Sequence, residues 1–469
     1  MTNRIKTTLG IIILGVSLSQ NSFAEAYGKL PVPEIEALPN GLKLAWFIND
    51  NLPVIDLALL IQSGYRDDPS GKSGTSELLS SCLDRGAAGM SAQQIAHSVE
   101  MLGASRYAST EDDTSSVGMH GLAPDGNLLL DLLSKLVIHP DFPEAEVSRE
   151  HARLIDRWNH IDDYGETLAA LAYHRAIAAN TSYGRGSFLS VDEFKKVTRK
   201  DVMDFHKKHF VPSNSILMIV GRVNKPEFRQ RILESFGKWS GAAPERIWKN
   251  YTDKRTASIK KNQIIIVNRS GLTQAQVRLG FRAPLLQAPE HYSLVVANAL
   301  LGEYFNSRLN SLIRDKLALT YSIGSSFSYS KDLGVFTITS ATRNETVGQL
   351  IHKTMDVLQD LKRGPIGPDE VQMAKDYLEG GFPLSTSTLG AVASRWLAGY
   401  VFGLGPEYLN EFILKIHQVK AEEVFAAVVK DFNLDHLFIV IAGDAKEISK
   451  SLKKTNYSQF KLVSVKQLK

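Results

Sequence analysis

The first residues whose spacing could support chemistry lie on a short predicted helix, Gly74–Leu83. Glu77, Ser80 and Ser81 stand at positions i, i+3 and i+4, so one helical face presents a carboxylate and two hydroxyls. A catalytic zinc ion takes three protein ligands, usually imidazole nitrogens or carboxylate oxygens, and leaves one position for water. Serine hydroxyls are poor zinc ligands at neutral pH, so we expect no metal cofactor in this chain.

The remaining nucleophiles and histidines do not form a second site. His206 and His209 are three residues apart, but no acidic residue has helical spacing beside them and Lys207 and Lys208 would repel a cation. We therefore predict surface histidines. The single cysteine, Cys82, excludes an intramolecular disulfide and falls on an apolar helical stripe, where a buried, unreactive thiol is expected. The G-x-S-x-G, P-loop and G-x-G-x-x-G motifs are absent from the sequence.

A further pair could donate hydrogen bonds. Arg314 closes a predicted helix, Ser307–Leu317, and Tyr321 begins the strand that follows. A guanidinium and a phenol are fixed donors that can stabilise a developing oxyanion. On spacing alone, an exposed helix arginine and a half-buried strand tyrosine are the favoured explanation of this pair.

The elements that must position these residues form two similar halves. Within residues 202–221 an amphipathic helix ends at Phe210, a short loop follows, and an apolar strand closes on Gly221. The same pattern recurs in residues 424–443, ending at Gly443. A repeat of this length favours two homologous halves rather than a solenoid, whose periods are shorter.

Each half begins with two predicted strands and continues with helices and one more strand. The predicted strands are Leu42–Phe47, Val54–Gln62, Ser115–Leu122, Ile264–Val267, Ala275–Phe281 and Gly334–Ala341. One long helix is predicted over Glu144–Ala178, and another over Leu389–Val401. This order predicts an α+β fold of two homologous halves, each a largely antiparallel sheet with helices packed on one face.

The N-terminal segment, residues 1–24, has the pattern of a secretory signal peptide. Basic residues precede a short apolar run over residues 9–16, and Ser22 and Ala24 are small residues at the −3 and −1 positions of a cleavage site. The run is too short to span a bilayer, and no cysteine follows it as a lipid anchor. We therefore expect a periplasmic protein, in a Gram-negative host, with no stable membrane insertion.

The rest of the chain is predicted to divide into residues 25–239, a linker over 240–261, and residues 262–469. The sequence of 469 residues carries 54 lysine and arginine side chains against 50 aspartate and glutamate side chains, a formal net charge of +4. Nucleic-acid-binding proteins usually have a marked basic excess, so we expect no nucleic-acid partner.

Several short segments keep the order seen in a known family. Ser63–Pro69 precedes the helix that carries Glu77, Ala108–Thr114 follows it, and Ser182–Gly186 comes later. With the doubled architecture, these segments resemble the pitrilysin/insulinase-type (inverzincin) zinc metallopeptidases, whose helix carries H-x-x-E-H. The resemblance covers residues 35–450.

The resemblance implies that the metal motif is degenerate. It places Glu77 at the first ligand, Ser80 at the catalytic base and Ser81 at the second ligand. The third ligand of the family, a glutamate on a later helix, becomes Arg157, or Asp156 after a shift of one residue. Without zinc and a carboxylate base, water is not activated. We expect Glu77 to form an ion pair with Arg157 instead.

The resemblance also gives Arg314 and Tyr321 a role. In the family such a pair faces the zinc from the other half of the clamshell and donates hydrogen bonds to the scissile region of the substrate. Some bacterial relatives are heterodimers in which one chain carries H-x-x-E-H and its paralogue lacks the metal site but keeps the pair. This sequence resembles the second type. The implied protein is a periplasmic pseudopeptidase subunit, with zinc held by a paralogous partner.

A peptide substrate is then expected to add as a strand along the edge segment Arg106–Ser116. Two alternatives stay open. One is a non-catalytic scaffold or peptide-binding clamshell, since a fold can be kept when its catalysis is lost. The other, less favoured by the ligand chemistry, is an active zinc metalloendopeptidase with substituted ligands.

Overall fold

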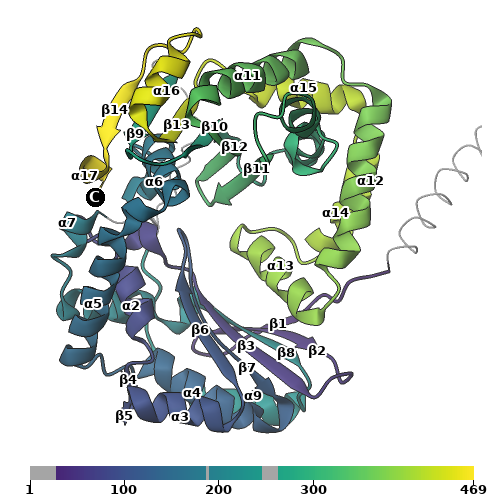
Figure 1. Ribbon diagram of the computed structural model, residues 1–469. Coiled ribbons are helices and arrows are strands. Elements are labelled where there is room, and N and C mark those ends of the chain that lie inside the picture. Colours follow the sequence, from purple (N-terminus) through teal and green to yellow (C-terminus); the bar gives the residue numbers. More distant parts are fainter. Residues whose placement is uncertain (1–27, 186–189, 246–261, 469) are drawn as a thin grey trace, which may run out of the picture.

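The computed structural model describes residues 28–185, 190–245 and 262–468. The predicted signal peptide and most of the predicted linker lie outside these ranges. In the described parts of the chain, no helix is both long enough and apolar enough to cross a membrane. Two six-stranded sheets dominate the fold (Figure 1).

The first sheet has the strand order β1–β2–β8–β3–β7–β6. Strands β2 and β8 are parallel, and the other neighbouring pairs are antiparallel. Its strands are β1 (Glu34–Ala37), β2 (Lys43–Ile48), β3 (Val54–Ile61), β6 (Ser105–Thr110), β7 (Ser115–Leu122) and β8 (Ser215–Gly221). A small ribbon pairs β4 (Gly86–Ala87) with β5 (Met90–Ser91).

The second sheet has the order β11–β12–β10–β13–β9–β14. Strand β9 is parallel to both of its neighbours, and the remaining pairs are antiparallel. Its strands are β9 (Gln263–Asn268), β10 (Gln274–Ala283), β11 (Ile323–Ser330), β12 (Leu333–Arg343), β13 (Phe438–Gly443) and β14 (Lys461–Ser464).

Helices cover the outer faces of both sheets (Figure 1). The helices of the first half are α2 (Thr75–Cys82), α3 (Ala92–Met101), α4 (Gly126–Ile138), α5 (Glu144–Asn159), α6 (Gly165–Ile177), α7 (Val191–Phe194), α8 (Arg199–His209) and α9 (Lys225–Phe236). Those of the second half are α10 (His291–Asn298), the π-helical segments η7 (Ala299–Glu303) and η8 (Asn310–Lys316), α11 (Val347–Arg363), α12 (Pro368–Ser385), α13 (Leu389–Val401), α14 (Tyr408–Gln418), α15 (Ala421–Asp431), α16 (Ala445–Leu452) and α17 (Val465–Leu468).

The two sheets repeat one topology. Strands β2, β8, β3, β7 and β6 lie in the same order as β9, β13, β10, β12 and β11. The repeat read from the sequence is α8 with β8 and α15 with β13. The halves differ at one edge, because β1 precedes β2 and is antiparallel to it, whereas β14 comes from the end of the chain and is parallel to β9. The α+β class and the two largely antiparallel sheets are therefore as expected.

Each half also contributes one helix that packs on the sheet of the opposite half. Helix α6 packs on the second sheet, where the Tyr173 hydroxyl donates to the carbonyl of Phe336 at 3.0 Å. Helix α13 packs on the first sheet, where Trp396 meets Phe47 with ring centroids 5.8 Å apart. Figure 1 shows both crossings. The two halves are thus joined through their hydrophobic cores as well as through the chain.

This exchange explains one wrong prediction. The helical pattern over residues 144–178 is two helices, α5 and α6, separated by a short turn at Ile161–Asp163. Helix α5 stays with the first sheet, while α6 must change direction to reach the second sheet. Periodicity within the segment does not report this change, because both helices have an apolar face.

Candidate functional site

Helix α2 carries the predicted metal-ligand positions, and its start is anchored by the Asp68 side chain. The Asp68 carboxylate accepts the backbone N–H groups of Gly74 (2.6 Å) and Ser76 (2.9 Å), which satisfies donors at the start of the helix. Burial raises the pKa of Asp68 to about 7, against the effect of these hydrogen bonds. Gly74 itself has φ 90°, a conformation that favours glycine.

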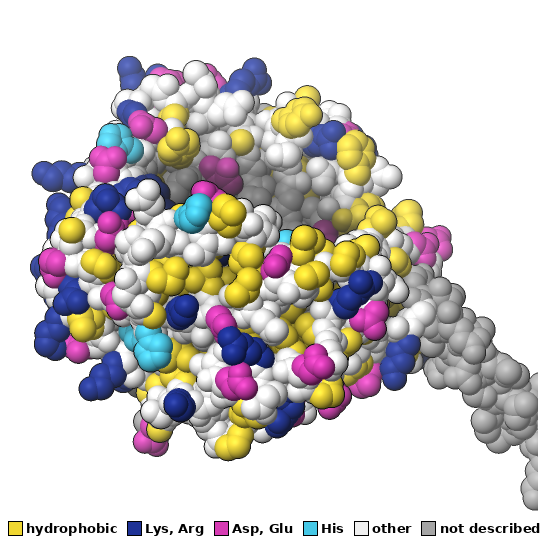
Figure 2. All heavy atoms as spheres, turned by 90° about the horizontal axis from the view of Figure 1, so that it is seen from below, with side chains coloured by type: hydrophobic (Ala, Val, Ile, Leu, Met, Phe, Trp, Pro, Cys, Tyr) yellow, Lys and Arg dark blue, Asp and Glu magenta, His cyan; other side chains and the backbone are white. Residues whose placement is uncertain are grey.

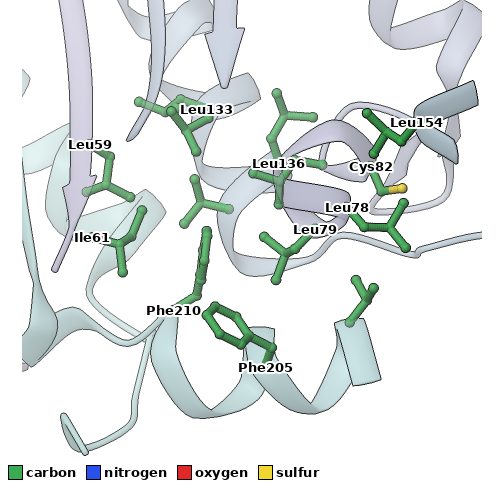
Figure 3. Packing of buried hydrophobic residues seen from close by; sticks show 14 of the residues in the cluster. Leu59, Ile61, Leu78, Leu79, Cys82, Leu133, Leu136, Leu154, Phe205 and Phe210 are labelled. Atoms are coloured by element: carbon green, nitrogen blue, oxygen red, sulfur yellow. The ribbon is translucent and has the colours of Figure 1, made fainter. Parts of the chain in front are cut away.

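The apolar side of α2 points into the core. Leu78, Leu79 and Cys82 are fully buried against Leu154 of α5 and Phe205 of α8 (Figure 3). Burial raises the pKa of the Cys82 thiol to about 12, so the thiolate is scarce at neutral pH. The prediction of a buried cysteine is confirmed. Glu77, on another face of the helix, lies beside Arg157 of α5.

The first-ligand and third-ligand positions do meet, but as an ion pair. The Arg157 guanidinium of α5 donates to Glu77 Oε1, as expected from the sequence. Glu77 is 14% exposed and Arg157 is 55% exposed. Burial raises the pKa of Glu77, although Arg157 acts to lower it. Asp156 is exposed and lies near His160, so Arg157 rather than Asp156 stands opposite Glu77.

The two serines are in different surroundings. Ser80 is buried, and its hydroxyl shares a 2.7 Å hydrogen bond with Thr110 of β6. The Thr110 hydroxyl in turn donates to the Ser76 carbonyl at 3.1 Å. Ser81 is only partly buried. A hydroxyl is a far weaker base than the carboxylate that the family has at this position. Ser80 therefore cannot accept a proton from water.

These residues do not fit the zinc ion that the resemblance implies. One carboxylate already paired with a guanidinium, together with two hydroxyls, is not a zinc donor set. Within the described residues, no group of three or more histidine, cysteine, aspartate or glutamate side chains is arranged to hold a metal. We therefore derive no step through a metal bound to this chain.

The histidines at the end of α8 differ from the prediction. His209 is buried and stacks on Phe205 with ring centroids 4.4 Å apart, and the His206 ring lies 2.7 Å from the carbonyl of Val137. They are packing residues rather than surface histidines. Burial lowers the pKa of His206, although the hydrogen bond to the Val137 carbonyl acts to raise it. The sequence concealed this because the polar residues between them, Lys207 and Lys208, are exposed.

A cavity that sequence reasoning missed adjoins the ion pair. It has a volume of about 500 Å³ and is lined by Tyr65, Glu77, Arg157, Trp158, Ile161, Tyr164 and Thr167. Its walls are mainly apolar, and Tyr164 is exposed at its edge. Trp158 directly follows Arg157 in the sequence, but nothing in the spacing of Ile161 and Tyr164 indicates that they close the same cavity.

The Arg314–Tyr321 pair has the opposite character. Tyr321 is 91% exposed, and Arg314, in η8, is partly exposed. The Arg314 guanidinium lies 5.9 Å from the Tyr321 ring centroid and 4.2 Å from that of Phe305, which is itself 60% exposed. Tyr321 is thus not a half-buried strand residue. An aromatic side chain so exposed has no packing duty within this chain.

The three family-like segments around α2 gather at the junction of the halves. Arg66 forms ion pairs with Asp113 (2.9 Å) and with Asp332 of the second half (3.0 Å). It also donates to the Tyr183 hydroxyl at 2.7 Å, and that hydroxyl donates to Asp113 at 3.0 Å. Arg66, Asp113 and Tyr183, one from each segment, therefore contribute to a buried network that joins the two halves. Asp332 completes it and was not predicted.

Strand β6, within the predicted edge segment Arg106–Ser116, is an outer strand of its sheet. A cavity of about 440 Å³ lies beside it. Tyr107 and Ser109 of β6 line this cavity together with Tyr329 of β11 and Leu397 of α13. The edge is therefore next to open space and within reach of an extended chain.

Comparison with protein families agrees with this architecture. Residues 47–188 match the family described as insulinase (peptidase family M16), and residues 196–378 match the peptidase M16 inactive domain. An uncharacterized zinc protease, YmxG, of Bacillus subtilis is 22% identical over 403 residues, which cover 86% of this chain and 96% of the relative. The uncharacterized zinc protease Rv2782c of Mycobacterium tuberculosis is 25% identical over 400 residues, which cover 84% and 89%.

Solved structures share the fold. A peptidase M16 inactive domain from Pseudomonas fluorescens superposes with a TM-score of 0.81 at 24% identity, covering 89% of this chain and 98% of that structure. A protease from Helicobacter pylori superposes with a TM-score of 0.80 at 21% identity, covering 88% and 100%. The doubled sheets, the order of the segments and these matches lead to one conclusion: the chain belongs to the insulinase family of peptidases, family M16.

Proposed function

We propose that this chain is the zinc-less subunit of a two-chain peptidase, and that Arg314 and Tyr321 complete the active site of a zinc-bearing paralogue. One observation carries the proposal. Tyr321 is 91% exposed and Arg314 is partly exposed, whereas the metal position of the same chain is occupied by the Glu77–Arg157 ion pair. A chain that cleaved peptides alone would need free metal ligands at this position in place of the ion pair.

The chemistry of the pair suits this role. When the partner's water attacks a peptide carbonyl, negative charge develops on the carbonyl oxygen. A guanidinium and a phenol hydroxyl aimed at that oxygen stabilise it more than they stabilise the uncharged substrate. Phe305 stacks on Arg314 and limits its rotamers, so less side-chain entropy is lost when the guanidinium binds substrate.

The proposed location is the periplasm, on the basis of the signal-like segment at residues 1–24. The proposed substrate is a peptide, and nucleic acid is not proposed as a partner. On the face seen in Figure 2, basic and acidic side chains are interspersed rather than gathered into one basic patch. That mixture suits recognition of a peptide backbone better than recognition of a polyanion.

Several relatives carry the name zinc protease, so an active zinc peptidase is the competing function. The donor set argues against it here, because the three ligand positions hold a carboxylate paired with a guanidinium, that guanidinium, and a hydroxyl. Metal analysis of the purified chain after dialysis tests this directly. Stoichiometric zinc together with chelator-sensitive cleavage by the lone chain would overturn the proposal.

The positive test mixes this chain with a paralogue from the same organism that has an intact H-x-x-E-H motif. We expect peptide cleavage by the mixture and none by this chain alone. Arg314→Ala should lower kcat of the mixture by about 10²- to 10³-fold, as removal of an oxyanion donor does elsewhere. Lys316→Ala, on the same helical segment, is the matched control and should leave kcat unchanged.

Assembly must be measured beside turnover. If Arg314→Ala and Tyr321→Phe reduce kcat while the dissociation constant of the two chains stays the same, the pair acts on substrate. Unchanged turnover in both variants would instead favour a non-catalytic scaffold. Failure of any H-x-x-E-H paralogue to bind this chain would have the same meaning.

A further inference from the structure

A further cavity lies where the two halves meet. It is bounded by helix α6 of the first half and by strands β9 and β14 and helix α17 of the second, which lie together in Figure 1. Its volume is about 680 Å³, a size typical of sites for small organic ligands. Among the described residues, it shares no lining side chain with the cavity beside Glu77 or with the cavity beside β6. A ligand bound here would therefore be independent of both.

The charged side chains that line this cavity are all basic among the residues that the structure describes. They are Arg175 of α6, Arg282 of β10 and Lys461 of β14, and no aspartate or glutamate joins them. The remaining described lining residues are apolar or carry side-chain amides. Glu193 acts on Arg175, but from α7 and not from the wall of the cavity. The cavity should therefore attract anions and repel cations.

Arg282 places a buried positive charge in this cavity. The residue is only 6% exposed. Its Nε donates to the carbonyl of Ile177 and its Nη2 to the carbonyl of Ala179, both at 2.6 Å. These acceptors are neutral groups at the C-terminal end of α6, and in the described parts of the chain no carboxylate pairs with Arg282. Burial lowers the pKa of this guanidinium, with no neighbouring carboxylate to raise it.

The contact with α6 accounts for part of the Arg282 guanidinium only. Its Nη1 group has no acceptor among the described residues, although the side chain lines the cavity. A buried charge without a counter-ion is unfavourable, and a carboxylate that accepts from a guanidinium forms one of the stronger hydrogen bonds in proteins. A carboxylate that entered the cavity would supply both an acceptor and the missing negative charge.

We propose that this cavity binds an amphipathic carboxylate, that is, a carboxylate attached to an apolar chain. The carboxylate accepts from the Arg282 guanidinium, and the positive charges of Arg175 and Lys461 add to the attraction. The apolar chain packs against the side chains of Phe438 and Phe460, which line the same cavity. The site goes beyond the proposed function, because it needs neither the partner chain nor zinc.

Other ligand classes fit these walls less well. An inorganic anion such as phosphate would pair with the basic groups but leave the apolar walls in contact with water. A neutral apolar molecule would cover those walls but leave Arg282 without a counter-ion. A cation would meet three like charges. Only a ligand with both a negative group and an apolar chain uses the whole cavity.

The test measures binding to the purified chain alone by isothermal titration calorimetry at pH 7.5. The probe is octanoate, butanoate tests the apolar chain, and octylamine, which is a cation at this pH, tests the charge. Each buried CH₂ group increases affinity by about fourfold, so we expect octanoate to bind at least tenfold more tightly than butanoate. Octylamine should bind at least tenfold more weakly than octanoate.

Two kinds of molecule carry this chemistry, a fatty acid and the C-terminal end of a peptide. N-acetyl-leucyl-leucine with a free carboxylate represents the peptide end, and its C-terminal amide is the matched control. Tighter binding of octanoate assigns the site to fatty acids, and tighter binding of the dipeptide acid assigns it to peptide ends. Either result supports the carboxylate site, provided that the amide binds more weakly than the acid.

Two variants of Arg282 separate its charge from its contact with α6. Arg282→Gln and Arg282→Lys both lose the fork that reaches two carbonyls, but only Arg282→Gln loses the charge. We expect Arg282→Gln to weaken octanoate binding at least tenfold and Arg282→Lys to weaken it much less. Arg343→Gln, at an exposed position at the end of β12 outside the cavity, is the matched control and should leave the affinity unchanged.

A third variant addresses the space rather than the charge. Ala176 of α6 is partly buried and lines the cavity, so Ala176→Phe should fill it and weaken octanoate binding at least tenfold. Circular dichroism verifies that each variant is folded. Ala176→Phe keeps the test decisive if Arg282→Gln does not fold.

The proposal is overturned if neither octanoate nor the dipeptide acid binds at millimolar concentration, or if octanoate binds no better than butanoate or octylamine. It is also overturned if folded Arg282→Gln and Ala176→Phe both keep the full affinity. The assay omits the partner chain and leaves Arg314 and Tyr321 unchanged, so its failure would leave the proposed function standing. Conversely, loss of complementation with a paralogue would not change the affinities measured here.

Discussion

The chain has two corners where its family concentrates chemistry, and they are built in opposite ways. At the Glu77–Arg157 corner, the two opposite charges form an ion pair, and the apolar side of α2 packs in the core. At the Arg314–Tyr321 corner, Arg314 is partly exposed and Tyr321 is 91% exposed. The first corner satisfies most of its own polar groups, while the second leaves its groups for another molecule.

The contrast teaches where to look for retained function in a degenerate enzyme. Replacement of ligands by residues that pair with each other removes the metal chemistry but keeps the helices in place. Exposed aromatic and cationic groups that contribute nothing to the core have no such internal explanation. The following experiments would break or sharpen this comparison, beginning with the largest expected effect.

Restoring the ligands should open the closed corner. The triple variant Glu77→His/Ser81→His/Arg157→Glu places two imidazoles one helical turn apart on α2 and a carboxylate on the facing helix α5. Because residues 77 and 157 already touch, we expect about one zinc ion per chain after dialysis, measured by plasma mass spectrometry.

The double variant Glu77→His/Ser81→His, which keeps the Arg157 guanidinium, is the matched control and should retain far less zinc. If the triple variant also binds none, the geometry of the two helices has changed along with the residue types. The difference between the two corners would then be due to the placement of α2 and α5 and not only to the residue types at positions 77, 81 and 157.

Removing Arg157 should expose the cost of the buried carboxylate. We expect Arg157→Ala to lower the free energy of unfolding by about 1–2 kcal/mol at pH 8, since Glu77 Oε1 loses the Arg157 donor while the carboxylate stays largely buried. Burial raises the pKa of Glu77, so the native state takes up a proton as the pH falls. The loss should therefore shrink toward pH 5.

Urea unfolding at both pH values measures this effect. In Glu77→Gln/Arg157→Ala no carboxylate remains to titrate, so the loss should be smaller and nearly independent of pH. A loss for Arg157→Ala that grows as the pH falls would contradict the assignment of a buried carboxylate.

The turn between Arg314 and Tyr321 contains a strained residue, Ala318, with φ 47°. A left-handed conformation is unfavourable for alanine, so Ala318→Gly should raise the free energy of unfolding by about 0.5 kcal/mol. Ala426→Gly, at an exposed position within helix α15, should instead lower it by about 1 kcal/mol. Equal signs for the two variants would show that Ala318 carries no strain.

The smallest effect is expected at Tyr321. If this side chain has no structural duty, Tyr321→Ala should change the free energy of unfolding by less than about 0.5 kcal/mol. Tyr183→Phe is the instructive contrast, because it removes one hydroxyl from the buried Arg66 network and should cost about 1–2 kcal/mol. Strong destabilisation by Tyr321→Ala would assign that tyrosine to the fold.

Local patterns predicted much of this architecture. Helices α2, α8 and α13 and the paired halves follow from periodicity and repeats, and the Glu77–Arg157 contact follows from the family resemblance. What the sequence concealed depends on contacts between distant segments. The break between α5 and α6, the burial of His209 and the junction partner Asp332 are each decided by elements far along the chain.

The candidate site was predictable in its residue types but not in its shape. Spacing on one helix placed Glu77, Ser80 and Ser81 on related faces, and the Arg–Tyr spacing was visible as well. The cavity formed by Trp158, Ile161 and Tyr164 was not, because it depends on the turn that redirects the chain between two helices. The exposure of Tyr321 likewise depends on which neighbours fail to cover it.

The reciprocal crossing of α6 and α13 has a consequence for biogenesis. During synthesis or export, the strands of the first sheet emerge long before residues 389–401, which supply the helix that shields one of their apolar faces. That apolar face remains exposed to solvent, and prone to aggregation, until most of the polypeptide has been made. Folding of the first half is therefore tied to completion of the second, and nascent or truncated chains should depend on chaperones to escape aggregation.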